Sequence, residues 1–387
     1  MELKIAVISD LHCRHSNSEK ENNTFLFSDS MRSPIKQHPA QALISLIDRE
    51  KLEADIILCP GDITNKTDPQ GLLTGWSYLE EIKEAFKAKH LIASLGNHDV
   101  DSRRIFNRYD PFSMPNRLKE NFPFPSKKSK DEYFAKKYCF IEFENVLIFN
   151  FNSVHSHTNN EDCLTSIITD DILENIEENL RFYSDERFQY KIAITHHHPI
   201  KHANIGSLYK DSDVIEKGDS LLKLIESNGF QIFIHGHKHI PRLVYYNSLP
   251  ILSSGSFSSL MNLMETGNKN MFHLITLYPN NVNGKVLSYQ FTNGLGWSNN
   301  FNSFDFPMQT GFGNRSSVND IASQIAEYFS SSQQEFIKFK DLKEKFTNLE
   351  FLIPSDFENL RKEINKKGLL FYPEIYSIPD QLTKKMQ

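Results

Sequence analysis

The sequence predicts an α/β protein with a mixed sheet, followed by a smaller, mainly helical C-terminal module. Short apolar runs bounded by glycine or proline alternate with amphipathic stretches of helical spacing. Continuous apolar runs are typical of the buried strands of βαβ units, because helices cover both faces of such a sheet. The length of 387 residues suggests two structural units rather than one.

The first half of the chain alternates strands with helices. Strands are expected at residues 5–9, 56–58 and 91–93, and amphipathic helices at 40–49 and 76–88. Further along, residues 138–151 alternate around a polar Glu-Asn pair, which predicts a hairpin and therefore a mixed sheet. Later strands are expected at 192–195, 230–234, 243–246, 251–252 and 271–278, with a helix at 220–227.

Two stretches interrupt this pattern. Residues 101–135 are polar and contain prolines, so we expect a cap or insertion beside a functional site. Periodicity also lapses near residues 293–317, where Gly, Asn, Ser and Phe dominate. We therefore divide the chain into a domain at 1–300, a linker at 301–317 and a C-terminal module at 318–387.

The C-terminal module reads as helices followed by a short apolar strand. Helices are expected at 321–329, 339–346 and 356–366, and the strand at 369–372. This order fits a small winged-helix-like module, and equally a helical brace on the main domain. A partner protein or a second copy of the chain could bind through it.

Five short motifs carry groups that can bind metal. They are Asp10-Leu11-His12, Gly61-Asp62, Gly96-Asn97-His98-Asp99, His196-His197-His198-Pro199 and Gly236-His237-Lys238-His239. Most follow an apolar run, and the carboxyl ends of strands are where open α/β sheets gather ligands. Side chains two residues apart in extended chain point the same way, so each D-x-H or H-x-H pair should face one centre.

The mixture of imidazole, carboxylate and carboxamide groups predicts two divalent transition-metal ions, which would be Mn, Fe, Zn or Ni. A calcium or magnesium site would show mainly oxygen ligands. Two such ions about 3.5–4 Å apart suit in-line displacement at phosphorus and generate hydroxide near neutral pH. His98 is then available to meet the charge on the leaving oxygen, and we expect Asp99 to orient it.

With these motifs the chain resembles the calcineurin-like metallophosphoesterase superfamily, whose pattern is DxH, GD, GNHD/E, H and GHxH. The resemblance covers residues 1 to about 260 and implies a four-layer αββα sandwich with a dimetal centre at its strand edge. It further implies Asp10, His12 and His239 on the first ion, Asn97, His197 and His237 on the second, Asp62 bridging both, and His98 as the transition-state histidine.

The fourth motif offers three histidines. In the superfamily the ligand usually precedes the proline by two positions, which selects His197, while His196 and His198 remain alternatives.

The residues after Asp62 discriminate between branches of the superfamily. Ser/Thr protein phosphatases continue with Asp-Arg-Gly, whereas this chain has Ile63-Thr64-Asn65. Purple acid phosphatases need a tyrosine ligand where this chain has Asn65. The stretch at 61–64 together with 76–81 is more similar to class III cyclic-nucleotide phosphodiesterases. We therefore expect hydrolysis of a phosphodiester, nucleotide-type substrate by metal-activated hydroxide.

Other functions remain as alternatives. The first is a metal-dependent DNA or RNA nuclease of the repair-exonuclease type, which the net charge of −6 disfavours without excluding nucleic acid as a partner. A phosphomonoesterase is a weaker alternative. A non-catalytic scaffold is weaker still, because none of the seven expected ligands is degenerate.

The sequence also bears on location. It opens on a strand, with no basic region followed by an apolar stretch and a cleavage site. No apolar segment approaches the roughly 18–20 residues that cross a bilayer. We expect a cytoplasmic protein without a membrane partner.

Overall fold

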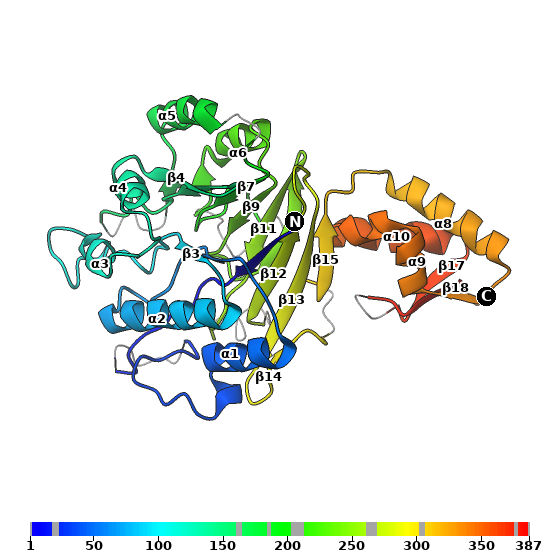
Figure 1. Ribbon diagram of the computed structural model, residues 1–387, viewed down its shortest axis with the longest axis horizontal. Helices are drawn as coiled ribbons and strands as arrows, with labels where there is room; N and C mark the ends of the chain where they lie inside the picture. Colours follow the sequence, from blue (N-terminus) through cyan, green and yellow to red (C-terminus); the bar gives the residue numbers. More distant parts are fainter. Residues whose placement is uncertain are drawn as a thin grey trace.

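The computed structural model describes residues 2–17, 23–159, 165–183, 187–202, 213–260, 269–301, 306–374 and 378–385. Two β-sheets pack face to face, and helices cover their outer faces (Figure 1). Among the described residues, no helix is both long and apolar enough to cross a membrane.

The first sheet has the order β14-β13-β12-β1-β2-β3, and β15 also pairs with β13. β1 is parallel to β2 but antiparallel to β12, so the sheet is mixed as predicted. Its strands are β1 (Leu3–Val7), β2 (Ile56–Cys59), β3 (His90–Ala93), β12 (Met271–Leu277), β13 (Gly284–Thr292), β14 (Gly296–Ser298) and β15 (Gln309–Phe312).

The second sheet has the order β10-β11-β9-β7-β5-β4. Its strands are β4 (Tyr138–Phe143), β5 (Val146–Phe151), β7 (Tyr190–Ile194), β9 (Ile232–His235), β10 (Pro241–Tyr246) and β11 (Leu249–Ser254). β4 and β5 form the predicted hairpin. A separate pair, β6 (Ser166–Ile167) and β8 (Ile215–Glu216), lies outside both sheets.

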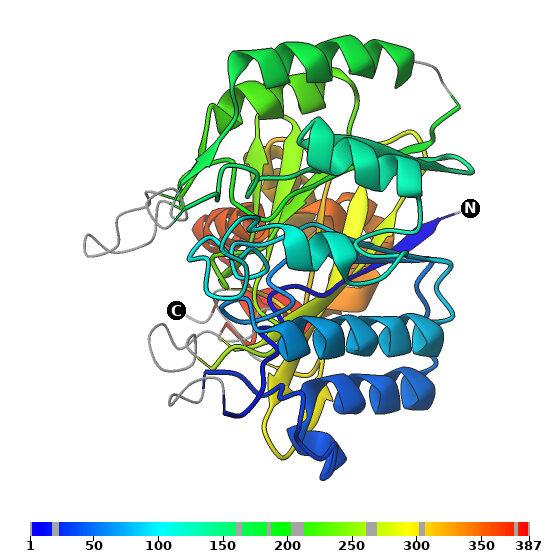
Figure 2. The ribbon, with the colours of Figure 1, turned by 90° about the vertical axis from the view of Figure 1, so that its left-hand side faces the viewer.

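Helices α1 (Pro39–Glu50) and α2 (Pro69–Phe86) cover the first sheet, and α5 (Asp170–Leu180) and α6 (Gly218–Ser227) cover the second (Figure 2). Alternate residues of β5 show the layering. Ile148 joins the core between the sheets, whereas Leu147 and Phe149 pack with residues of α5 and α6. This arrangement confirms the predicted four-layer sandwich. The insertion at 101–135 carries two helices, α3 (Ser113–Arg117) and α4 (Lys127–Ala135).

Helix α2 shows how local sequence positions a site loop. Asp68 accepts a hydrogen bond of 2.8 Å from the backbone N–H of Gly71, and Pro69 takes the first helical position. Both are favoured at a helix start, where N–H groups lack partners within the helix. The loop after β2 carries Asp62, and this cap fixes the point at which that loop ends.

The C-terminal module has the order of a winged helix and its own core. Its sheet, β16-β18-β17, packs against helices through Ile325, Leu342, Leu360 and Leu382. The elements are α8 (Val318–Ser332), β16 (Phe336–Lys338), α9 (Phe339–Lys345), η4 (Thr347–Phe351), α10 (Pro354–Lys366), β17 (Leu369–Tyr372) and β18 (Gln381–Lys384). The sequence predicted the three helices and β17, but not β16 or β18.

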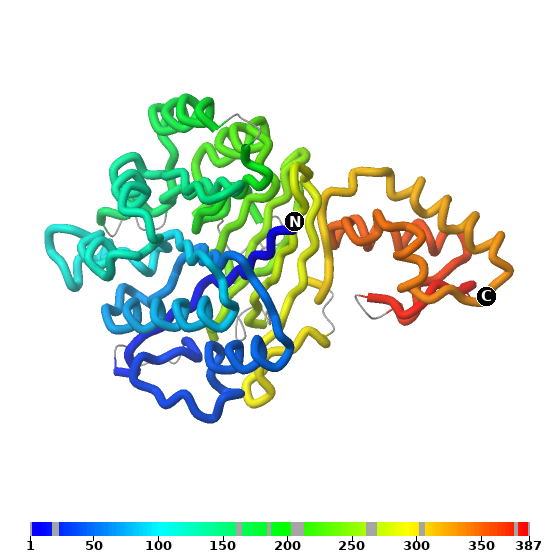
Figure 3. The backbone as a smooth tube through the Cα atoms, in the orientation of Figure 1, coloured from blue at the N-terminus to red at the C-terminus, as the bar shows by residue number. Residues whose placement is uncertain are grey.

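The predicted linker contains a strand of the main domain. Residues 309–312 form β15, which pairs with β13 and leads into the module (Figure 3). The sequence hid this strand because Gly311 and Gly313 remove the side-chain alternation that identifies strands. The module then docks on β15, where Thr310 Oγ1 donates to the carbonyl of Leu352 at 3.0 Å. The domain boundaries at 300 and 317 remain a proposal.

Replacement of Gly311 by alanine should weaken this docking. A Cβ there would lie 2.0 Å from the carbonyl oxygen of Glu350 in η4, so one element must shift. We expect a loss of roughly 1–3 kcal/mol in unfolding free energy, and faster proteolysis between the main domain and the module. Chemical denaturation and limited proteolysis measure both effects. Gly294→Ala is the control: no atom lies within 4 Å of its Cβ, so its left-handed φ of 84° costs stability without a contact to the module. Equally faster proteolysis before the module in both variants would contradict the docking contact.

Candidate metal centre

The five motifs meet at one edge of the sandwich. Their residues lie in the loops after β1, β2, β3, β7 and β9. β1, β2 and β3 run parallel in one sheet, and β7 and β9 run parallel in the other. Since parallel strands end at the same edge, loops far apart in sequence converge there.

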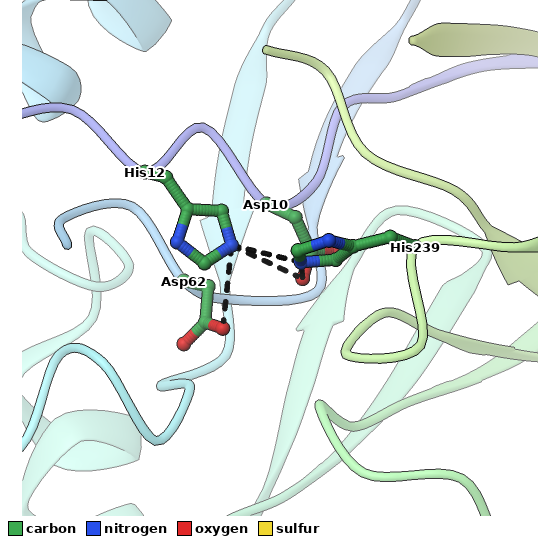
Figure 4. A group of neighbouring side chains, drawn as sticks. All are labelled: Asp10, His12, Asp62 and His239. Carbon is green, nitrogen blue, oxygen red and sulfur yellow. Dashed lines mark hydrogen bonds and ion pairs between the residues drawn. The ribbon is translucent and has the colours of Figure 1, made fainter. Parts of the chain in front are cut away.

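The first group of donor atoms comes from Asp10, His12, Asp62 and His239, whose ligand atoms all lie within 4.8 Å of one another (Figure 4). His12 Nε2 is 2.8 Å from His239 Nε2, which is 3.3 Å from Asp10 Oδ1. Asp62 Oδ2 lies 3.7 Å from His12 Nε2. These are the residues that the resemblance assigns to the first ion and to the bridge.

The second group comprises Asp62, Asn97, His196 and His237. Asn97 Oδ1 lies 3.0 Å from both His196 Nε2 and His237 Nδ1, and these nitrogens are 3.2 Å apart. Asp62 Oδ2 is 3.3 Å from His196 Nε2, so the same oxygen belongs to both groups. A shared carboxylate oxygen is the arrangement expected of a bridging ligand.

Both groups fit a pair of transition-metal ions. Metal–ligand distances of about 2.0–2.2 Å place neighbouring donor atoms roughly 3.0–3.5 Å apart, close to the separations within each group. Asp10 Oδ2 is buried and has no hydrogen-bond partner among the residues that the structure describes. A buried carboxylate oxygen without a partner is costly, so a cation there would stabilise it.

The structure differs from the expectation for the fourth motif: it places His196, not His197, beside Asp62 and Asn97. His196 Nδ1 donates to the carbonyl of Pro60 at 3.1 Å, so the lone pair of Nε2 faces the centre. His197 belongs to neither group: its Nδ1 lies 2.9 Å from Ser153 Oγ, and its ring packs on that of His237 with centroids 4.4 Å apart. The spacing from the proline could not show which of the three histidines faces Asp62, because the direction of each side chain depends on the turn after β7.

The backbone geometry of the motifs also differs from expectation. β1 ends at Val7 and β9 at His235, so the ligand pairs lie beyond the extended chain. Left-handed φ angles occur at Asp10 (55°), His12 (47°), Asp62 (50°), His237 (72°) and His239 (56°). Such angles are unfavourable for residues other than glycine and cluster at functional sites, where surrounding structure holds them. Turns, not strands, therefore direct these side chains inward.

Two glycines of the motifs are required by close approach. A Cβ on Gly96 would lie 2.1 Å from Asp62 Oδ1, and one on Gly236 would lie 2.5 Å from Asp10 Oδ2. Both carboxylates therefore pack directly against backbone. The GN and GH motifs thus leave space for the carboxylates as well as supplying ligands.

His98 lies next to the first group. Its ring packs edge-on against His12, with centroids 4.7 Å apart. The backbone N–H of Lys66 donates to His98 Nδ1 at 3.1 Å. A neutral His98 therefore carries its proton on Nε2, the atom suited to protonate a leaving group.

Asp99 does not orient His98, contrary to expectation. Its carboxylate is buried and accepts 2.9 Å hydrogen bonds from the backbone N–H groups of Thr64 and Gly96. It therefore ties the loop after β2 to the loop after β3. Burial and the nearby charge of Asp62 raise the pKa of Asp99 above its usual range. Lys66 takes the orienting role through its backbone, which no side-chain pattern signals.

In the metal-free centre the histidines differ in protonation state. Burial and the neighbouring His98 and His239 lower the pKa of His12 to about 3, so His12 is neutral. Burial would also lower the pKa of His196, but the charges of Asp62 and Asp10 outweigh it and raise that pKa to about 9. A protonated His196 thus offsets part of the buried negative charge.

Comparison with known proteins agrees with the fold. The sequence model described as Calcineurin-like phosphoesterase matches residues 3–241, so the chain belongs to the calcineurin-like phosphoesterase family. A second sequence model, described as wHTH-Calcineurin_assc, matches residues 310–364. No curated protein matches the chain significantly in sequence.

Among solved structures, the chain is similar to a purple acid phosphatase from yellow lupin (Lupinus luteus) seeds, with 12% identity and a TM-score of 0.50 over 76% of this chain and 52% of that one. It is also similar to a putative 5'-nucleotidase from Staphylococcus aureus, with 11% identity and a TM-score of 0.40 over 72% of this chain and 51% of that one. The chain thus spans about half the length of each. The lupin likeness supports the fold alone.

Variants of the two neighbouring histidines should separate their roles. His196→Ala removes a donor that lies 3.3 Å from the shared Asp62 oxygen, so we expect about one ion fewer per chain. His197→Ala should retain both ions, because its ring lies outside both groups. Elemental analysis after dialysis against Mn²⁺ gives the stoichiometry. Loss of an ion from His197→Ala alone would restore the assignment expected from the sequence.

Metal loading should depend on pH in a defined direction. An imidazole must be neutral to bind an ion, and His196 with a pKa of about 9 is protonated at pH 7. Affinity for the second ion should therefore rise, by up to about tenfold per pH unit, between pH 7 and 9. Calorimetric titration with Mn²⁺ in buffers of different ionisation enthalpy should show about one proton released. A Mn²⁺ affinity that does not change between pH 7 and 9 would contradict the protonation of His196.

Proposed function

We propose that the protein is a dimetal-dependent phosphoesterase whose substrate is a phosphodiester of nucleotide type. One observation carries the proposal: two groups of transition-metal donors share an oxygen of Asp62, with His98 beside them. Paired sites of this kind suit in-line displacement at phosphorus. Asp10, His12 and His239 would hold one ion, and Asn97, His196 and His237 the other.

When bound, the two ions would polarise the phosphoryl oxygens and lower the pKa of an attacking water. The chain itself supplies the rest. His98, oriented by the backbone N–H of Lys66, donates the Nε2 proton to the leaving oxygen. Asp99 acts indirectly, because its two backbone hydrogen bonds hold the loops that present Asp62 and His98.

The preference for a diester rests on the sequence similarity around Asp62 to the class III phosphodiesterases. Purple acid phosphatases have a tyrosine ligand at the position of Asn65. The similarity to the lupin enzyme is therefore no argument for iron chemistry in this chain. The insertion at 101–135 adds a candidate for substrate contact. Arg104 donates to the carbonyls of Arg108 and Thr158, which leaves the exposed Arg103 as the candidate for binding phosphate.

The nuclease alternative depends on whether the C-terminal module binds nucleic acid. Winged-helix modules place a helix against nucleic acid or protein. The exposed positions of α10 mix Lys362 and Lys366 with Glu358, which is not the single-sign basic face expected for tracking phosphates. We therefore favour a small phosphoester or nucleotide substrate. Cytoplasmic location remains a prediction from the sequence.

A substrate panel tests the proposed function. With Mn²⁺ or Ni²⁺ the protein should hydrolyse bis-p-nitrophenyl phosphate and a cyclic or linear nucleotide diester faster than p-nitrophenyl phosphate or DNA. His98→Ala should reduce kcat for the diester by about 10²–10⁴ at unchanged metal content, whereas Asp62→Asn should lose both turnover and metal. His90→Asn, at the opposite end of β3, is the control.

The panel can also overturn the proposal. Full diester turnover by His98→Ala would refute the role of that histidine. Faster cleavage of single- or double-stranded DNA than of nucleotides, lost steeply as salt rises, would instead support the nuclease.

A further inference from the structure

A carboxylate outside the five motifs contacts the second group of donors. Asp213 lies just before β8, and its Oδ2 is 2.6 Å from Nε2 of His237. The other ring nitrogen of His237, Nδ1, faces Asn97 Oδ1 and His196 Nε2 at 3.0 and 3.2 Å. The two nitrogens of one imidazole thus serve two different partners.

This arrangement fixes the tautomer of His237. An ionised carboxylate can only accept, so Nε2 carries the proton and donates it to Asp213. The lone pair then lies on Nδ1, the atom that faces Asp62, Asn97 and His196. Histidines that bind metals commonly donate their other N–H to a carboxylate, which fixes ring orientation and makes the ligand more basic.

Asp213 is itself held in place. Lys238 Nζ lies 2.6 Å from Asp213 Oδ1, and the Lys238 side chain is almost fully buried, at 7% exposure. The ammonium group offsets the negative charge of the carboxylate. His198 is more distant, with Nε2 4.0 Å from Asp213 Oδ1. A third ion among His198, Asp213 and His237 would have to compete with Lys238 for this oxygen.

We infer that Asp213 is a positioning residue that holds His237 in the tautomer and orientation needed to bind the second ion. The inference rests on the proposed function in so far as the second ion serves the reaction. Asp213 acts through His237. Its carboxylate oxygens contact the side chains of His237 and Lys238, and neither contact involves the Asp62 oxygen that the two groups share.

The test compares Asp213→Ala and Asp213→Asn with Glu216→Ala, a control that removes a nearby exposed carboxylate. Mn²⁺ titration against a competing chelator gives the affinity of each ion. Asp213→Ala should weaken the second ion by about 10- to 100-fold and leave the first unchanged. Asp213→Asn, whose amide oxygen still accepts, should recover part of that loss, and Glu216→Ala should match wild type.

A second measurement does not depend on metal or turnover. Nitrogen chemical shifts of the His237 ring in metal-free protein report which nitrogen carries the proton. Wild type and Asp213→Asn should show the proton on Nε2, and Asp213→Ala a mixture of tautomers. Denaturation of the metal-free variants reports any structural defect.

Several results would overturn the inference. One is an unchanged tautomer and unchanged metal affinity in Asp213→Ala. Another is that Asp213→Ala loses both ions equally and is also less stable. The third is that wild type binds a third ion, which Asp213→Ala loses. Absence of diester turnover in a wild type that binds two ions would refute the proposed function only, because the affinity and tautomer measurements stand without catalysis.

Discussion

The rest of the site depends on one constraint: the carboxylates of Asp10 and Asp62 are buried together at one edge of the sandwich. Buried charges of one sign are costly unless cations or hydrogen bonds compensate them. Here backbone N–H groups of His98 and His237 donate to them, and His12, His196 and His239 surround them. Glycines in the neighbouring motifs allow the carboxylates to pack against backbone. The remaining demand for positive charge suits the centre to a pair of cations.

The sandwich supplies the rigidity that such a centre requires. Five ligands adopt left-handed φ angles, which persist only where surrounding structure holds them. The strands that end at this edge are mostly buried between helices and the opposite sheet, so the turns that follow them start from fixed positions. Support also comes from residues outside the two donor groups. Asp99 joins two loops, Lys66 orients His98, and Asp213 contacts the far side of His237.

The C-terminal module connects to this architecture away from the ligands. It has its own core and docks on β15 at the edge strand of the first sheet, where Lys285 and Glu350 form an ion pair at 2.7 Å. β15 itself pairs with Gly284–Leu287 of β13 and so covers part of an edge that would otherwise present unpaired backbone groups. The module is thus joined to the main domain by backbone hydrogen bonds, from Gly311 to Leu352 and from Asn314 to Phe351, as well as by the chain itself.

Local sequence determined most of the strands and helices through residue 278, the four-layer class and most of the candidate metal donors. Apolar periodicity and turn residues encode those features within a few positions. It did not identify β13 and β14, although both pair with strands adjacent in sequence, or β15 and α5. The placement of His196 rather than His197 beside Asp62 and Asn97, the left-handed turns and the contacts of Asp99, Lys66 and Asp213 were decided only by tertiary structure. They depend on which side chain or N–H faces a centre assembled from five distant loops, and no spacing along one segment specifies that direction.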